Sequence, residues 1–205
     1  MSSSLAVAEA ELLPMEQIEC RATELLVSLP PHVWNGADLP IPVEEIADSQ
    51  LGLLVLDRED IPCPPPGPDG ESRISGLLIP ARREIWIDAD EARQWPARRR
   101  FTIAHEIGHW LLHRDRSGDG DETFCRATVV HAEDEEASVP TRKPKRDYPP
   151  AEVEANAFAA ALLMPAPLIR MKYEEMRARE LDFAWLCRRF DCSGAAMGRR
   201  LHSVV

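Results

Sequence analysis

The chain has 205 residues, with 24 Lys and Arg against 35 Asp and Glu, which gives a formal net charge of −11. This length suits one compact domain, or one domain with a small appendage, and 44% apolar residues can build a modest core, which excludes a wholly disordered chain. An acidic chain is also a poor general binder of nucleic acids or anionic membranes, because both require a positive surface.

The five cysteines indicate reduced thiols, since their number is odd and none forms a C-x-x-C pair. The first residues, MSSSLAVAEAELLP, contain Glu9 and Glu11 and no basic segment, which is not typical of a signal peptide. The longest apolar run, Ala157–Met164, is about half of the ~20 residues that a membrane span needs. We therefore expect a cytoplasmic protein.

Hydrophobic spacing predicts a mixture of helices and short strands. Helices are expected at Glu11–Leu29, Val43–Ser49, Ala97–His113 and Ala151–Met164, followed by Leu168–Arg179, Leu181–Phe190 and Ser193–His202. Strands are expected at Leu51–Asp57, Ile74–Ile79 and Glu84–Asp88, and a short edge strand could form within Thr123–Val130. The second and third strands are close enough in sequence to form a hairpin.

The helix expected at Ala97–His113 contains the motif H-E-x-x-H, with His105, Glu106 and His109. Two His one helical turn apart project from the same face and can both reach one zinc ion. Glu106 lies slightly around the helix, where it can act as a general base on a water molecule without being a metal ligand. The opposite side is apolar and carries Ile103, Ile107, Trp110 and Leu111.

A catalytic zinc ion usually has a third protein ligand. His113 would require the metal to shift along the helix, so we expect it to cap the last turn instead. The Ala-rich helix expected at Ala151–Met164 can pack closely on the His helix and supply a carboxylate. Glu152 and Glu154 point about 160° apart at ~100° per residue, so only one of them can face the metal. We expect Glu154, with Glu152 as the reserve.

The strings RRRFTIAHEIGHWLLH and EVEANAFAAALLMP resemble the two metal helices of the ImmA/IrrE family of zinc-dependent metallopeptidases, which are gluzincin-like. The resemblance extends over about Pro42 to Pro165, although the gap between His109 and Glu154 is longer than is usual for the family. It implies the zinc ligands His105, His109 and Glu154, the catalytic acid/base Glu106, and a supporting role for Asn156. Ligands of this type also accept manganese or iron.

Together, pattern and resemblance predict an α+β fold, in which a small mixed sheet of three or four strands packs on a zincin-type pair of metal helices. Residues 1–12 are expected to form a flexible tail. Residues 13–165 are expected to form the metallopeptidase domain, including a charged insertion at 114–150, and residues 166–205 a helical extension with helix–turn–helix-like spacing.

The resemblance implies a metalloendopeptidase that cleaves a protein. In the family this substrate is typically a helix-turn-helix repressor or antitoxin-like regulator encoded nearby, in bacterial phage, mobile-element or stress-response circuits. Two other kinds of function remain open: a non-proteolytic metal-containing sensor or interaction module, and a DNA-binding regulator with a vestigial peptidase site. Glu106 weighs against both, because a pure binding site needs no base. Candidate oxyanion donors are Tyr148, Tyr173 and His131.

The C-terminal helices are locally basic, but we expect them to pack rather than to bind DNA, because the chain is acidic overall. Ser193 is expected to cap the last helix. The expected core of this unit consists of Leu186, Phe190, Met197 and Leu201.

Overall fold

The computed structural model describes residues 12–62, 74–114, 124–125 and 149–205, and its α+β class confirms the prediction. The helices of this part are α1 (Met15–Ser28), α2 (Val43–Glu45), α3 (Ala89–Gln94), α4 (Pro96–Leu112), α5 (Pro150–Leu163), α6 (Ala166–Ala178), α7 (Phe183–Phe190) and α8 (Gly194–Val204). A π-helical turn, Ile46–Gln50, continues α2. The strands are β1 (Leu54–Arg58), β2 (Gly76–Ile79), β3 (Glu84–Asp88) and β4 (Phe124–Cys125).

The four strands form one mixed sheet in the order β1-β3-β2-β4. The expected hairpin is confirmed, with β2 antiparallel to β3 and the two strands joined by a 3-10 turn at Pro80–Arg82. β1 lies parallel to β3 on the other side. The edge strand expected within Thr123–Val130 is reduced to β4, which pairs with Leu77 and Leu78, while the rest of that range lies outside the described residues.

Proline begins both helices that carry the predicted metal ligands. Pro96 is the first residue of α4 and Pro150 the first residue of α5. A helix has no internal acceptor for its first N–H group, so proline loses nothing there and its fixed φ favours the helical turn. The structure adds the short helix α3, which the sequence did not predict, and Asp88 caps it by accepting a hydrogen bond from the Glu91 N–H.

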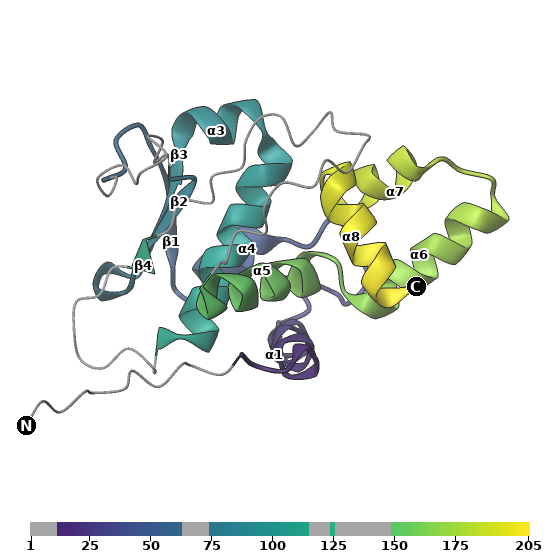
Figure 1. Cartoon of the computed structure of the whole chain (residues 1–205), viewed down its shortest axis with the longest axis horizontal. Coiled ribbons are helices and arrows are strands. Elements are labelled where there is room, and N and C mark those ends of the chain that lie inside the picture. Colours follow the sequence, from purple (N-terminus) through teal and green to yellow (C-terminus); the bar gives the residue numbers. More distant parts are fainter. Residues whose placement is uncertain (1–11, 63–73, 115–123, 126–148) are drawn as a thin grey trace, which may run out of the picture.

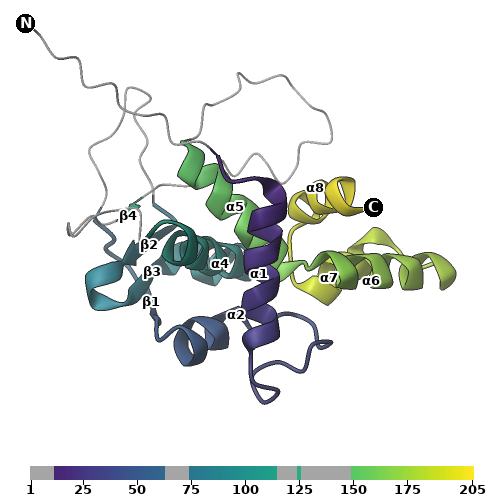
Figure 2. The same cartoon turned by 90° about the horizontal axis from the view of Figure 1, so that it is seen from below.

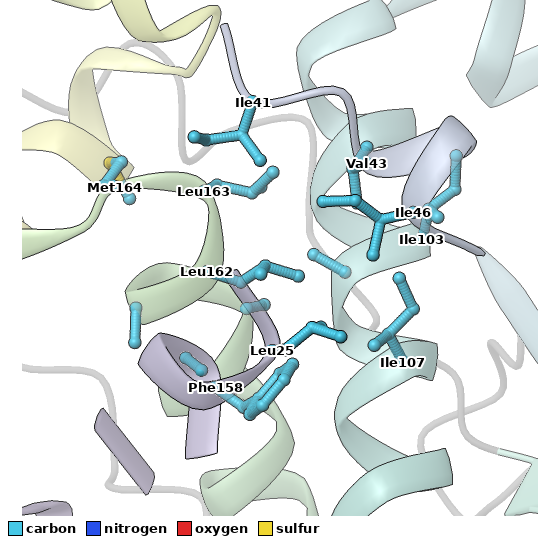
Figure 3. Close-up of a cluster of buried hydrophobic side chains, with 14 of the residues drawn as sticks. Leu25, Ile41, Val43, Ile46, Ile103, Ile107, Phe158, Leu162, Leu163 and Met164 are labelled. Carbon is cyan, nitrogen blue, oxygen red and sulfur yellow. The ribbon is translucent and has the colours of Figure 1, made fainter. Parts of the chain in front are cut away.

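Helix α4 lies at the centre of the fold. It packs against β2 and β3 on one side and against α5 on another, while α1 packs against α5 (Figures 1 and 2). Ile103 and Ile107 of α4 are fully buried with Phe158 and Leu162 of α5 (Figure 3). Leu111 differs from the expected apolar face of α4, because 38% of it is exposed.

The C-terminal helices join the same core. Leu186, Phe190 and Met197 are fully buried and belong to the hydrophobic cluster that contains Phe158. Ser193 caps α8, as expected, by accepting a hydrogen bond from the Ala196 N–H. Within the described residues, no single helix has both the length and the apolar composition to cross a membrane; the bent pair α5 and α6 passes that test only together.

Candidate metal centre

The site begins with a close crossing of α4 and α5 at Gly108. A Cβ atom at this position would lie 3.1 Å from the Ala155 Cα atom, 3.2 Å from the Ala155 carbonyl oxygen and 3.3 Å from the Phe158 Cβ atom. These separations are tighter than ordinary packing, and two of the contacts are with backbone, which cannot rotate away. Glycine at 108 therefore lets α5 lie close to α4 next to His109.

Replacing Gly108 by Ala should force the two helices apart and lower the free energy of unfolding by about 1–3 kcal/mol, the usual cost of overpacking. Urea unfolding in the presence of a chelator would measure the change. Gly198→Ala is the matched control, because a Cβ atom there meets nothing within 4 Å and alanine favours the helix. An equal or stabilising effect of both substitutions would contradict the close crossing.

Three side chains meet at this crossing. The Nε2 atoms of His105 and His109 are 3.0 Å apart. The carboxylate of Glu152 lies 3.4 Å from His105 Nε2 through Oε2, and 3.5 Å from His109 Nε2 through Oε1. All three residues are buried.

This group could hold a metal ion. Ligand atoms around a tetrahedral zinc ion with bonds of ~2.0–2.1 Å are ~3.3 Å apart, close to the three separations observed. Two imidazoles and a carboxylate are also the donor set of many catalytic zinc sites, which keep a fourth position for water or substrate. The residues present therefore fit a catalytic zinc ion.

The third ligand, a carboxylate, differs from our expectation. Glu154 does not face the His pair; it hydrogen-bonds the His113 ring at 2.8 Å and accepts from the Leu13 N–H at 2.7 Å. Glu152, the reserve candidate, takes the place beside His105 and His109. Both carboxylates reach α4, but at different places. Glu152 lies beside His105 and His109, while Glu154 lies one helical turn further along α4, between His113 at the end of that helix and the Leu13 N–H before α1.

Asn156 supports this assignment. Its Oδ1 atom lies 3.1 Å from His105 Nδ1, the ring nitrogen opposite the one that faces Glu152. Glu152 and Asn156 are four residues apart, so they share one face of α5. The position of Asn156 was thus the signal in the sequence that could have distinguished the two glutamates.

The charges suit metal ligation. Burial raises the pKa of Glu152, but the neighbouring imidazoles of His105 and His109 outweigh it and hold this pKa well below its usual range, so the carboxylate is ionised. Burial lowers the pKa of His109 below its ordinary value, which favours the neutral imidazole that binds metals. Burial also lowers the pKa of His105, but the neighbouring Glu152 carboxylate and the charge of Glu106 raise it above its ordinary value, so a metal ion bound here would displace a proton from this imidazole.

Glu106 lies on α4 beside this group and is buried against β2. Burial raises its pKa to about 7, although the charge of His105 and a hydrogen bond from the Leu78 backbone lower it in part. Its Oε2 atom is buried and has no hydrogen-bond partner among the described residues. A carboxylate with a pKa near neutrality and an unused oxygen has the properties of a general base.

Gly76 of β2 makes room for Glu106. A Cβ atom at this position would lie 2.3 Å from the Thr102 Cγ2 atom and 3.2 Å from Glu106 Oε1. Gly76→Ala should therefore displace the base and lower any Glu106-dependent activity by about 100-fold, as a shift of ~1 Å can do. Its zinc content should stay near that of the wild type, because the clash is with Thr102 and Glu106 rather than with the three candidate ligands.

The double variant Gly76→Ala/Thr102→Ser is the matched test of that prediction. Serine lacks the Cγ2 methyl group that the new Cβ atom would strike, so part of the activity should return. Initial rates and zinc content of the two variants would be compared. Wild-type rates for Gly76→Ala, or no recovery in the double variant, would contradict the role given to Gly76.

The other candidates do not belong to this group of three, or they lie outside the described residues. His113 stands at the C-cap of α4, as expected, but its ring is buried between His109 and Glu154. Tyr173 lies on α6, with the Arg177 guanidinium over its ring. Tyr148 and His131 fall outside the described residues, as does most of the insertion at 114–150.

Comparison with known proteins agrees with this chemistry. The model of the peptidase M78 family, described as the IrrE N-terminal-like domain, matches residues 68–202, which is more than half of the chain. No curated protein matches. Among solved structures, a Mycobacterium tuberculosis transcriptional regulator matches with a TM-score of 0.51 and 18% identity. The match covers 91% of this chain but 46% of that one, so the chain spans about half of its length, and the likeness concerns the fold alone.

Proposed function

The chain belongs to the peptidase M78 family of IrrE N-terminal-like domains, a metallopeptidase-type family, and on that basis we propose that it is a zinc-dependent endopeptidase acting on a protein substrate. The observation that carries this proposal is the position of Glu106. This buried carboxylate has one oxygen with no hydrogen-bond partner in the described part of the chain, and it lies beside the group formed by His105, His109 and Glu152. A site that only stored a metal would have no use for such a base.

The three ligands would be His105, His109 and Glu152. A zinc ion held by them would supply Lewis acidity, which lowers the pKa of water and polarises the scissile carbonyl group. Glu106 would accept the proton of the attacking water and then deliver it to the leaving amine, so that the peptide bond breaks with addition of one water molecule. Its pKa of about 7 suits both transfers near neutral pH.

The substrate that we propose is a helix-turn-helix transcriptional regulator, of repressor or antitoxin type, encoded near this chain. The support is the resemblance of both metal-helix strings to the ImmA/IrrE family. The name of the M. tuberculosis neighbour also belongs to transcriptional regulation, although it describes that protein.

We do not propose direct DNA binding by the C-terminal helices. Arg200, one of their basic residues, is buried; it donates to the Met164 carbonyl and pairs with Glu19 of α1. It is therefore used inside the fold. Leu186, Phe190 and Met197 are likewise core residues, as expected of a packing unit.

The proposed function can be tested by co-expressing the chain with the helix-turn-helix protein encoded beside it. We expect a discrete fragment of that protein with the wild type and none with the His105→Ala/His109→Ala variant. Mass spectrometry of the fragment would locate the cleaved bond. An intact partner, together with an inactive zinc-loaded enzyme on a library of unstructured peptides, would contradict the peptidase assignment.

A further inference from the structure

A chain of buried side chains continues from the candidate metal centre to the start of α1. The Nδ1 atom of His109 lies 3.0 Å from the Nδ1 atom of His113. The Nε2 atom of His113 lies 2.8 Å from Glu154 Oε2. Glu154 Oε1 accepts from the Leu13 N–H at 2.7 Å, just before α1. All three side chains are buried, with Glu154 only 1% exposed.

Hydrogen bonding assigns one arrangement of protons to this chain. Glu154, as a carboxylate, can only accept, so the Nε2 atom of His113 donates to it. The Nδ1 atom of a neutral His113 is then an acceptor, and the Nδ1–H of His109 donates to it. This leaves the Nε2 atom of His109 with its lone pair directed toward His105 and Glu152, which is the form that a metal requires.

His105, the other His of the centre, is held in the same way, but by the Asn156 amide. His105 Nδ1 faces Asn156 Oδ1 at 3.1 Å, so its Nδ1–H can donate to the amide oxygen and its Nε2 atom stays free for the metal. Each His thus has a partner at the nitrogen that faces away from the centre. Such partners fix the orientation of a ligand and increase its basicity.

From these contacts we infer that His113 and Glu154 are positioning residues, which hold His109 in the tautomer and orientation that bind the metal. This role replaces the ligand role that we expected for Glu154. It also links the metal centre to the backbone of Leu13, so the start of α1 is part of the support of the site. The inference rests on the proposed metal site but not on peptide cleavage.

Two substitutions of His113 separate positioning from simple packing. His113→Phe keeps the ring but removes the acceptor for His109 and the donor for Glu154. His113→Asn leaves a smaller side chain, but its amide oxygen stands near the place of the imidazole Nδ1 atom and can accept from His109. If His113 only fills space, Phe should bind zinc better than Asn; if it positions His109, Asn should bind zinc better than Phe.

Zinc affinity would be measured on the full chain by competition with a chelating dye. Urea unfolding of the metal-free proteins would give the free energy of unfolding of each variant, which reports the loss of packing. We expect affinity to fall about 10- to 100-fold in the Phe variant, the usual effect of losing an outer partner, and less in the Asn variant. Glu154→Gln keeps the shape of the side chain, but its NH₂ group would face either the His113 N–H or the Leu13 N–H, both of which are donors. This variant should also bind zinc more weakly, and it provides the test if the Phe variant does not fold. Wild-type affinity of the Phe variant or of Glu154→Gln, or an affinity order that follows stability, would overturn the inference.

The outcome is independent of the proposed function. If the zinc affinities follow the expected order but no partner is cleaved, the positioning role holds and the peptidase function is contradicted. If the variants keep wild-type zinc affinity and still cleave the partner, the positioning role is contradicted and the peptidase function holds.

Discussion

Glu106→Gln should retain the metal and lose cleavage by about 100- to 10,000-fold, the range that a general base contributes. The carboxamide has the shape of the carboxylate and can still accept the hydrogen bond from the Leu78 backbone, so the fold should not change. It cannot accept the proton of water. The measurement is zinc content by elemental analysis beside the initial rate of cleavage of the partner protein.

The control for this variant is Glu174→Gln, which makes the same chemical change at an exposed position of α6. It should cleave at the wild-type rate. A Glu106→Gln variant that cleaves as fast as this control would remove Glu106 from the reaction. One that loses its zinc would make Glu106 part of the metal site instead of its base.

Glu152→Ala should weaken zinc binding more than any change at Glu154. The carboxylate of Glu152 lies within 3.5 Å of both imidazoles, and its removal deletes one of the three candidate ligands. Glu154 supports the site only through His113, so its substitution should lower zinc affinity by no more than ~10- to 100-fold, the loss typical of residues that hydrogen-bond a metal ligand. Dye competition over a series of zinc concentrations would give both affinities.

Glu152→Gln is the matched variant, because it keeps the size of the side chain and one oxygen but loses the charge. It should bind zinc more weakly than the wild type and more strongly than Glu152→Ala. The opposite result, with Glu154→Ala as the weakest binder, would restore the ligand set expected from the sequence. If Glu152→Ala and Glu154→Ala bind zinc equally well, neither glutamate is the third ligand.

The His pair could be predicted from the sequence because both residues lie on one helix, whose period fixes their spacing. His105 and His109 are four residues apart, and any α-helix brings them to one face. The core positions Ile103 and Ile107 of α4 follow from the same period, and both are fully buried. The period did not predict the end of the apolar face: Leu111 is 38% exposed, whereas its neighbours Trp110 and Leu112 are buried.

The third ligand required knowledge of how two helices cross. The angle between Glu152 and Glu154 followed from helical geometry, but the sequence did not give the face of α5 that meets α4. The two helices cross closely at Gly108, and this crossing brings Glu152 rather than Glu154 beside both imidazoles. Asn156, one turn after Glu152, carried the missing information, since a residue that supports a ligand shares the face of the ligands.

Longer-range features were not predictable in this way. The parallel pairing of β1 with β3, with β2 on the far side of β3, depends on contacts across the whole domain rather than on local pattern. The chain from His109 through His113 to Glu154 joins two helices and the segment before α1, over a sequence separation of 141 residues between Leu13 and Glu154. His113 was expected only at the C-cap of its own helix.

The most direct test of the metal centre is zinc X-ray absorption on the zinc-loaded wild-type protein, which reports the number and type of ligand atoms. The account predicts two imidazoles at ~2.0–2.1 Å, with oxygen atoms completing the shell, and no sulfur at ~2.3 Å. The Glu152→Ala variant should lose an oxygen scatterer or the metal itself. A shell with three imidazoles would require a further His as a ligand, and a shell with sulfur would place the zinc on cysteine; either result would contradict the centre formed by His105, His109 and Glu152.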